Sequence, residues 1–206
     1  MMRFTTKLLP SRTGNLGILQ LNNPKALNAL TLDMIHRIQD TLAEWTTQGN
    51  APAAILLRSN VEESKIPSFC AGGDVKGVYL AVIEEGSSSG HGKRGLASAD
   101  FFRDEYTLNH RLATLSTSSL APKDCNNESG DPVIISFWDG LVMGGGVGRS
   151  IYGMFRVATE RTVWAMPECG IGLFPDVGSL YWMPRLLNED MAVYLALTGR
   201  RLDASD

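Results

Sequence analysis

Short apolar segments alternate with segments of helical periodicity along this chain. AAILLRS at 53–59 and VIISFWDG at 133–140 are runs of the kind found in strands that are covered on both faces. The segment LDMIHRIQDTLAEWTTQ, which begins at Leu32, carries apolar side chains at helical spacing, with Thr31 as a candidate N-cap and Gly49 and Asn50 as stop signals. The alternation predicts an α/β protein built from strand–helix–strand crossover units.

The beginning of the chain has two interpretations. RFTTKLLP and GNLGILQLN have the pattern of two strands joined by a turn. The first residues also contain Arg, Lys, Ser and Thr without an acidic residue, which is typical of mitochondrial presequences. We favour the hairpin, because both segments have strand character and a Pro/Ser/Gly turn lies between them.

Composition places the chain among globular proteins. It has 206 residues, of which 44% are apolar and 20% charged, so one domain covering residues 1–206 is expected. The net charge of −3 argues against a basic nucleic-acid-binding surface, and no apolar run approaches the roughly 18 residues that cross a membrane. The cysteines Cys70, Cys125 and Cys169 have neither CxxC nor histidine spacing, so neither disulfides nor a metal site is expected.

Two polar segments interrupt the alternating pattern. Residues 84–100 are rich in Ser and Gly, and residues 116–132 are similar. We expect both to be flexible surface insertions, with 86–98 among the least regular parts of the structure. Strand-type segments continue after each, so neither is expected to mark a domain boundary.

Two glycine clusters carry the first chemical signal. CAGGD at 70–74 and MGGGVG at 143–148 each follow an apolar segment and precede a predicted helix. Each can therefore offer free backbone N–H groups to an anionic or polarised oxygen. Neither has the spacing of a nucleotide-binding motif. On their own, such clusters are more often tight turns or close packing.

Two carboxylates lie in the apolar segment AMPECGIGLFPDVG at 165–178. A buried carboxylate needs a compensating interaction or a chemical use, and Glu168 and Asp176 are therefore candidate site residues. Asp176 follows Pro175 and has a turn or N-cap as its alternative role. A third acidic residue, Glu105, lies in FFRDEYTLN, and the sequence there is also compatible with a solvated helix face.

Several stretches resemble the crotonase superfamily, and within it the 3-hydroxyisobutyryl-CoA hydrolases. They are NNPKALNAL, SFCAGGDVKG, YLALTGRRL and the long segment from Met143 to Leu186. The resemblance implies a spiral of βαβ units with two roughly perpendicular sheets, and a helical C-terminal part that lies beyond Asp206 in family members. It also implies valine catabolism in mitochondria, with the cytoplasm or peroxisomes as alternative locations.

The resemblance assigns a role to each candidate residue. Gly73 and Gly145 match the two backbone donors of an oxyanion hole, Glu168 and Asp176 match the catalytic acids, and Glu105 matches a substrate-binding residue. The implied partner is an acyl-CoA substrate. No cofactor is implied, since coenzyme A is part of the substrate, and a homo-oligomer is possible.

Three alternatives stay open at this level. Hydratases of the superfamily use a second glutamate at the position of Gly148, so a hydratase or isomerase is a weaker match. Some family members are non-catalytic structural subunits. Within the hydrolase interpretation, Glu168 is either a general base on water or a nucleophile that forms a transient anhydride. The family also has further glycines where this chain has Ser179 and Leu180.

Overall fold

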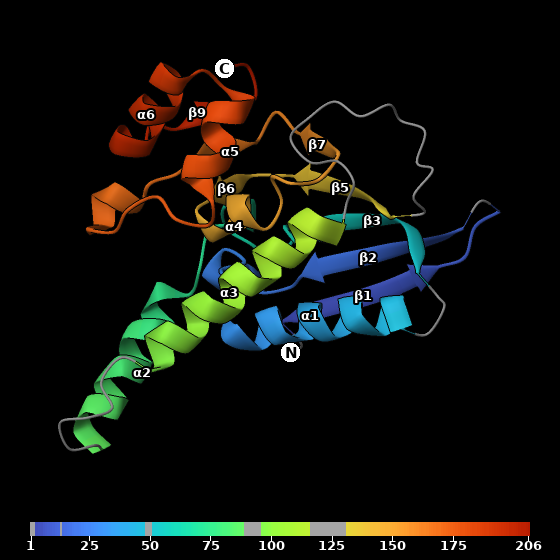
Figure 1. Cartoon of the computed structure of the whole chain (residues 1–206), viewed down its shortest axis with the longest axis horizontal. Coiled ribbons are helices and arrows are strands. Elements are labelled where there is room, and N and C mark those ends of the chain that lie inside the picture. The colour runs from blue at the N-terminus through green and yellow to red at the C-terminus, as the bar shows by residue number, and fades with distance from the viewer. Residues whose placement is uncertain (1–2, 13, 48–50, 89–95, 116–130) are drawn as a thin grey trace.

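The first sheet is mixed and contains the predicted N-terminal hairpin. In the computed structural model, which describes residues 3–12, 14–47, 51–88, 96–115 and 131–206, its strands are β1 (Phe4–Leu9), β2 (Asn15–Leu21), β3 (Pro52–Ser59), β5 (Val133–Trp138) and β7 (Phe155–Ala158) (Figure 1). β1 and β2 are antiparallel, whereas β2, β3, β5 and β7 are parallel neighbours in that order. Parallel pairing requires crossovers, so the α/β prediction is confirmed.

The second sheet is smaller and carries the glycine clusters. Its strands are β4 (Ser68–Cys70), β6 (Leu141–Met143), β8 (Val163–Ala165) and β9 (Leu202–Asp203), in that spatial order. The first three are parallel, and β9 is antiparallel to β8. The CAGGD and MGGGVG segments therefore leave neighbouring strands at the same edge of this sheet.

Three long helices form one packed group. They are α1 (Leu32–Thr47), α2 (Val75–Ser88) and α3 (Leu96–Leu115); α3 contacts both others, and α1 also contacts β1 of the first sheet. The Thr31 hydroxyl accepts a hydrogen bond from the Met34 amide at 3.3 Å, which confirms the predicted N-cap of α1. The predicted stop signals after α1 lie outside the described residues. Figure 1 shows α3 crossing the molecule and projecting with α2 from one end.

The prediction of a flexible insertion at 84–100 was wrong at both ends. Residues 84–88 complete α2, and α3 begins at Leu96. The Glu85 carboxylate accepts a hydrogen bond from the Ala97 amide at 2.8 Å and so satisfies a free donor in the first turn of α3. Residues 89–95, and residues 116–130 of the second polar segment, lie outside the described residues.

The remaining helices are short. The helix expected after the second glycine cluster is a single turn, α4 (Gly145–Gly148), and the chain then turns into β7. A short 3-10 helix, η1 (Pro24–Ala26), precedes α1; another, η2 (Glu168–Ile171), leads to α5 (Ser179–Leu186) and α6 (Glu189–Thr198). In the described part of the chain, no helix has the length and apolar character that crossing a bilayer requires.

Candidate active site

Three neighbouring parallel strands end at the candidate site. Gly73 follows β4, Gly145 follows β6, and Glu168 follows β8, each within three residues of the strand. The carboxyl ends of parallel strands form the usual binding edge of α/β sheets, because loops and helix N-termini meet there. The sheet thus brings together residues that are almost 100 positions apart in the sequence.

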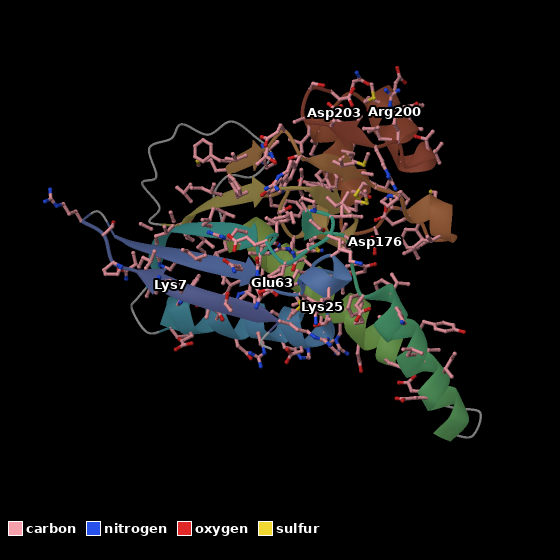
Figure 2. All side chains as sticks on the ribbon, turned by 180° about the vertical axis from the view of Figure 1, so that it is seen from behind. Lys7, Lys25, Glu63, Asp176, Arg200 and Asp203 are labelled. Carbon is pink, nitrogen blue, oxygen red and sulfur yellow. The ribbon has the colours of Figure 1, made fainter. Side chains whose placement is uncertain are left out.

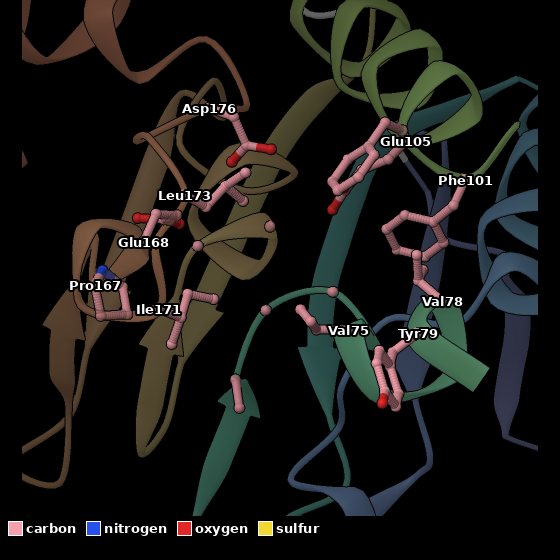
Figure 3. Close-up of a pocket in the computed structure, with 17 residues that line it drawn as sticks. Val75, Val78, Tyr79, Phe101, Glu105, Pro167, Glu168, Ile171, Leu173 and Asp176 are labelled. Atoms are coloured by element: carbon pink, nitrogen blue, oxygen red, sulfur yellow. The ribbon is translucent and has the colours of Figure 1, made fainter. Parts of the chain in front are cut away.

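All five residues predicted from the sequence line one cavity of about 330 Å³. Figure 3 shows Glu168 and Asp176 on one side of this pocket and Glu105, which projects from α3, on the other. In the view from behind, Asp176 lies between the C-terminal elements and the α2–α3 pair (Figure 2). The remaining lining residues are Ala71, Gly72, Val75, Val78, Tyr79, Phe101, Phe102, Gly144, Pro167, Ile171, Gly172 and Leu173.

The backbone amides of Gly73 and Gly145 lie close together and are free. A β-carbon on Gly145 would lie 3.3 Å from the Gly73 nitrogen. Since a β-carbon lies about 2.5 Å from the nitrogen of its own residue, the two nitrogens are within roughly 6 Å of each other. Within the described part of the chain, neither amide donates a hydrogen bond. One oxygen placed between them can accept from both.

The NNPKALNAL segment holds the first glycine cluster in place. The Leu30 amide donates to the Gly72 carbonyl at 2.8 Å, and the Asp74 amide donates to the Leu30 carbonyl at 2.9 Å. These bonds bracket Gly73 and leave its own N–H unused. Asn28 is fully buried, and its side-chain amide donates to the carbonyls of Asn60 and Ser68 at 2.9 and 2.7 Å. This motif therefore fixes the position of the Gly73 amide.

Glu168 presents a buried carboxylate next to the second glycine cluster. Its side chain is 6% exposed, and its Oε2 atom has no hydrogen-bond partner among the described residues. Its Oε1 atom would lie 2.7 Å from a β-carbon on Gly144. Burial raises the pKa of Glu168 to about 7, and the charge of Asp176 adds to the rise. At neutral pH the group is therefore able to accept a proton.

Glu105 faces the same point from α3. It is 2% exposed, and its Oε1 atom has no partner in the described structure. That atom lies so close to Gly145 that a β-carbon there would collide with it. Burial raises the pKa of Glu105 to about 8, with smaller contributions from the charges of Asp176 and Glu168. Glu105 is therefore mostly protonated at neutral pH and can donate a hydrogen bond.

Asp176 is held by a residue that the sequence did not single out. The Tyr106 hydroxyl donates a hydrogen bond to Asp176 Oδ2 at 2.8 Å. Burial raises the pKa of Asp176, and the hydrogen bond from Tyr106 opposes that rise. Burial also raises the pKa of Tyr106, as does its bond to Asp176. The two residues are 70 positions apart, so no local pattern pairs them.

Gly148 lies beside the site with no room for a side chain. A β-carbon at this position would overlap the side chain of Val177, which is 4% exposed. Val177 directly follows Asp176 and has a φ of 48°, which is rare for a β-branched residue. The space next to Gly148 is thus filled by the segment that carries Asp176.

His36, His110 and Cys169 do not line this pocket. His36 pairs with Asp104 at 2.7 Å, and His110 is exposed whereas Glu105 is buried. The Cys169 thiol donates to the Ala196 carbonyl at 3.3 Å. No group of three or more His, Cys, Asp or Glu side chains suited to a metal ion occurs among the described residues.

Paired free amides beside a buried carboxylate form a site that can polarise a carbonyl group. Residues 16–206 match the sequence profile of the enoyl-CoA hydratase/isomerase family, and the chain belongs to that family. The superfamily resemblance noted in the sequence is thereby confirmed.

Individual relatives carry more specific names. The chain is 40% identical over 201 residues to a mitochondrial 3-hydroxyisobutyryl-CoA hydrolase of Danio rerio, covering 98% of this chain and 45% of that protein. The corresponding values for the Homo sapiens protein of the same name are 40% over 200 residues, 97% and 44%. The chain therefore spans less than half the length of these relatives.

Solved structures share the fold. A carnitinyl-CoA dehydratase from Mycobacterium thermoresistibile is 31% identical, with a TM-score of 0.72 over 98% of this chain and 50% of that one. An enoyl-CoA hydratase from Rhodobacter sphaeroides is 29% identical, with a TM-score of 0.71 over the same shares. The crotonase-like α/β fold that the sequence predicted is confirmed.

Proposed function

We propose that this chain carries the active site of an acyl-CoA thioester hydrolase, with 3-hydroxyisobutyryl-CoA as its substrate. The names of its relatives support the substrate, and the word mitochondrial in those names supports that location. The pocket supports thioester chemistry, since free amides and a buried carboxylate line the same cavity. Coenzyme A belongs to the substrate in this proposal, and no further cofactor takes part.

In the proposed reaction, the Gly73 and Gly145 amides donate to the thioester oxygen and stabilise the charge that develops on it. Glu168 takes a proton from water while the water oxygen bonds to the carbonyl carbon. The carbon–sulfur bond then breaks, and the departing coenzyme A thiolate receives the proton that Glu168 took from water, which regenerates the Glu168 carboxylate. Direct attack by the Glu168 carboxylate, which would give an anhydride that water then hydrolyses, uses the same geometry.

Asp176 and Glu105 complete the proposed site. Asp176, held by Tyr106, orients the water or the substrate. Glu105 is mostly protonated at neutral pH and donates to the substrate hydroxyl, which gives its unpartnered carboxyl group a use. A 3-hydroxy group lies close enough to the thioester for both interactions to occur at once.

The packing of Val177 against Gly148 is the observation that favours a hydrolase over a hydratase. A hydratase of this superfamily resembles this chain at Glu168 but needs a second glutamate at the position of Gly148. Here the Val177 side chain fills that space, so a longer residue has no room without displacement of the Asp176 segment. Without a second glutamate at the position of Gly148, the site suits hydrolysis better than the two proton transfers of hydration.

A turnover assay on the full-length protein tests this function. The wild type should hydrolyse 3-hydroxyisobutyryl-CoA and should not hydrate crotonyl-CoA. Glu168→Gln should bind acyl-CoA almost normally and lose on the order of 10²–10⁴ in kcat, because the positioned base is gone. A folded wild type without hydrolysis would defeat the proposal in favour of a structural role, and crotonyl-CoA hydration would favour a hydratase.

A further inference from the structure

A second cavity of about 470 Å³ lies beside the first one. It is lined by α3, by the segment after Asp176 and by the start of α5. None of the five residues predicted from the sequence lines it, and the proposed reaction leaves it unused. Its lining residues are Tyr106, Asn109, His110, Ala113, Thr114, Tyr152, Val177, Gly178 and Tyr181.

The two cavities follow one another along α3. Phe101 and Glu105 line the first, and Asn109 lines the second, at successive intervals of four residues. Residues at this spacing share one helix face, and each interval advances about 6 Å along the axis. Glu105 and Asn109 are 2% and 4% exposed, so this face is turned inward at both cavities.

The Tyr106–Asp176 hydrogen bond stands at the boundary between them. Asp176 lines the first cavity, Tyr106 lines the second, and the bond that joins them is 2.8 Å long. The next residue, Val177, also lines the second cavity. Tyr106 is 40% exposed, so its ring can turn outward without leaving a closely packed core. The boundary between the two cavities is thus formed by the Tyr106–Asp176 hydrogen bond and the partly exposed ring of Tyr106.

Asn109 gives the second cavity a polar wall. Neither its Oδ1 nor its Nδ2 atom has a partner among the described residues, although the side chain is buried. A buried amide without hydrogen bonds is costly, so a group that both donates and accepts is favoured beside it. A hydroxyl group meets both requirements.

We propose that the second cavity is a distal acyl subsite and that Tyr106 controls access to it. With the Tyr106–Asp176 bond in place, the acyl group is confined to the first cavity and must be short. When the ring turns away, a longer chain passes from the oxyanion hole along α3, and its terminal hydroxyl pairs with Asn109. Tyr106 is therefore a specificity-determining residue. The inference rests on the proposed function, since it places the thioester at Gly73 and Gly145.

Binding of non-hydrolysable analogues to the full-length protein tests the subsite without relying on turnover. The probes are ketone analogues of acyl-CoA with a propyl chain, a hexyl chain, or a hexyl chain with a terminal hydroxyl. The wild type should prefer the short probe. Tyr106→Ala should raise the affinity for the hydroxylated long probe, relative to the short one, by at least about tenfold. Tyr194→Ala, which removes a tyrosine lining neither cavity, should leave this ratio unchanged.

A second substitution tests the polar wall. In the Tyr106→Ala background, Asn109→Leu should abolish the preference for a terminal hydroxyl over a methyl group. If Tyr106→Ala does not fold, Tyr106→Leu decides, since it keeps an apolar side chain on the helix. An unchanged probe ratio in a folded variant would overturn the inference, and so would a wild type that binds long and short probes equally. Failure of the proposed function would instead show as absent hydrolysis, whatever the binding ratios are.

Discussion

The side chain of Val177 occupies the space beside the α-carbon of Gly148, so that the Asp176 segment packs directly on α4. Val177 holds a positive φ there, and its burial among core residues offsets part of that strain. The carboxylate of Asp176 is thus placed by a neighbour that fits only against a glycine. The identities of residues 148 and 177 are therefore coupled.

Gly148→Ala should destabilise the protein through this contact. Overpacking typically costs about 1–3 kcal/mol, and the rigid Val177 has little freedom to move aside. Val177→Gly should relieve the overlap, because it removes the β-carbon that lies closest to the added methyl, so the double variant should be more stable than the sum of the single effects implies. Urea denaturation of the four proteins measures the coupling. Additive single effects would contradict the contact.

Gly145→Ala should damage the oxyanion hole more than the fold. The added methyl would lie 3.3 Å from the Gly73 nitrogen and against Glu105, where the proposed reaction places the thioester oxygen. Blocking these donors should lower kcat for thioester hydrolysis on the order of 10²–10³. Gly170→Ala is the matched control, because nothing lies within 4 Å of a β-carbon at Gly170. Equal losses in both variants would argue against the assigned hole.

The sequence predicted the α/β class and two acidic site residues because those signals are local. The two-sheet fold, the roles of Gly73 and Gly145, and Glu105 followed from the family resemblance. Strand and helix periodicity appears within single segments, and a glycine cluster after an apolar strand marks a backbone that must stay bare. Glu168 and Asp176 stood out because their neighbours are apolar. The structure places both in the pocket, and their catalytic roles stay predictions.

What the sequence missed depends on partners far along the chain. Tyr106 bonds to a residue 70 positions away, and Val177 packs on Gly148 from a different segment. Asn109 is a polar residue on a helix, and it is buried because its face of α3 points toward the interior. The polar composition of residues 84–100 suggested a loop, whereas the Glu85–Ala97 contact extends the helices into it. Such contacts arise only after folding.

The pH dependence of hydrolysis should follow the carboxyl groups of the pocket. Glu168 must be ionised and Glu105 protonated, and burial raises the pKa of each, to about 7 and about 8 respectively. We expect kcat/KM to rise with pH until about pH 7 and to fall above about pH 8. The two apparent pKa values of this profile describe the interacting carboxyl groups together rather than single residues. Initial rates across this range, corrected for spontaneous hydrolysis, provide the measurement.

Asp176→Asn should shift the acidic limb of that profile. After burial, the charge of Asp176 is the other contribution that raises the pKa of Glu168. Its removal favours ionisation of Glu168, so the acidic limb should move to lower pH while the maximal rate falls. Asp33→Asn, on the exposed start of α1, provides the matched control and should leave the limb in place. A limb that moves to higher pH would contradict the arrangement.

Glu105→Gln should stabilise the folded protein at alkaline pH. The pKa of Glu105 is raised by burial from about 4.5 in the unfolded chain to about 8 in the folded one, so the folded state binds the proton more tightly. The stability that Glu105 contributes is complete below the pKa of the unfolded chain, about 4.5. It is lost as the pH rises toward the pKa of the folded chain, about 8, by up to about 1.4 kcal/mol per pH unit. A neutral glutamine avoids that loss. Urea denaturation near pH 5 and pH 9 should therefore give a difference between variant and wild type that grows with pH. The exposed Glu160→Gln should give none, and a pH-independent difference for Glu105→Gln would mean that its carboxyl group is not protonated in the folded protein.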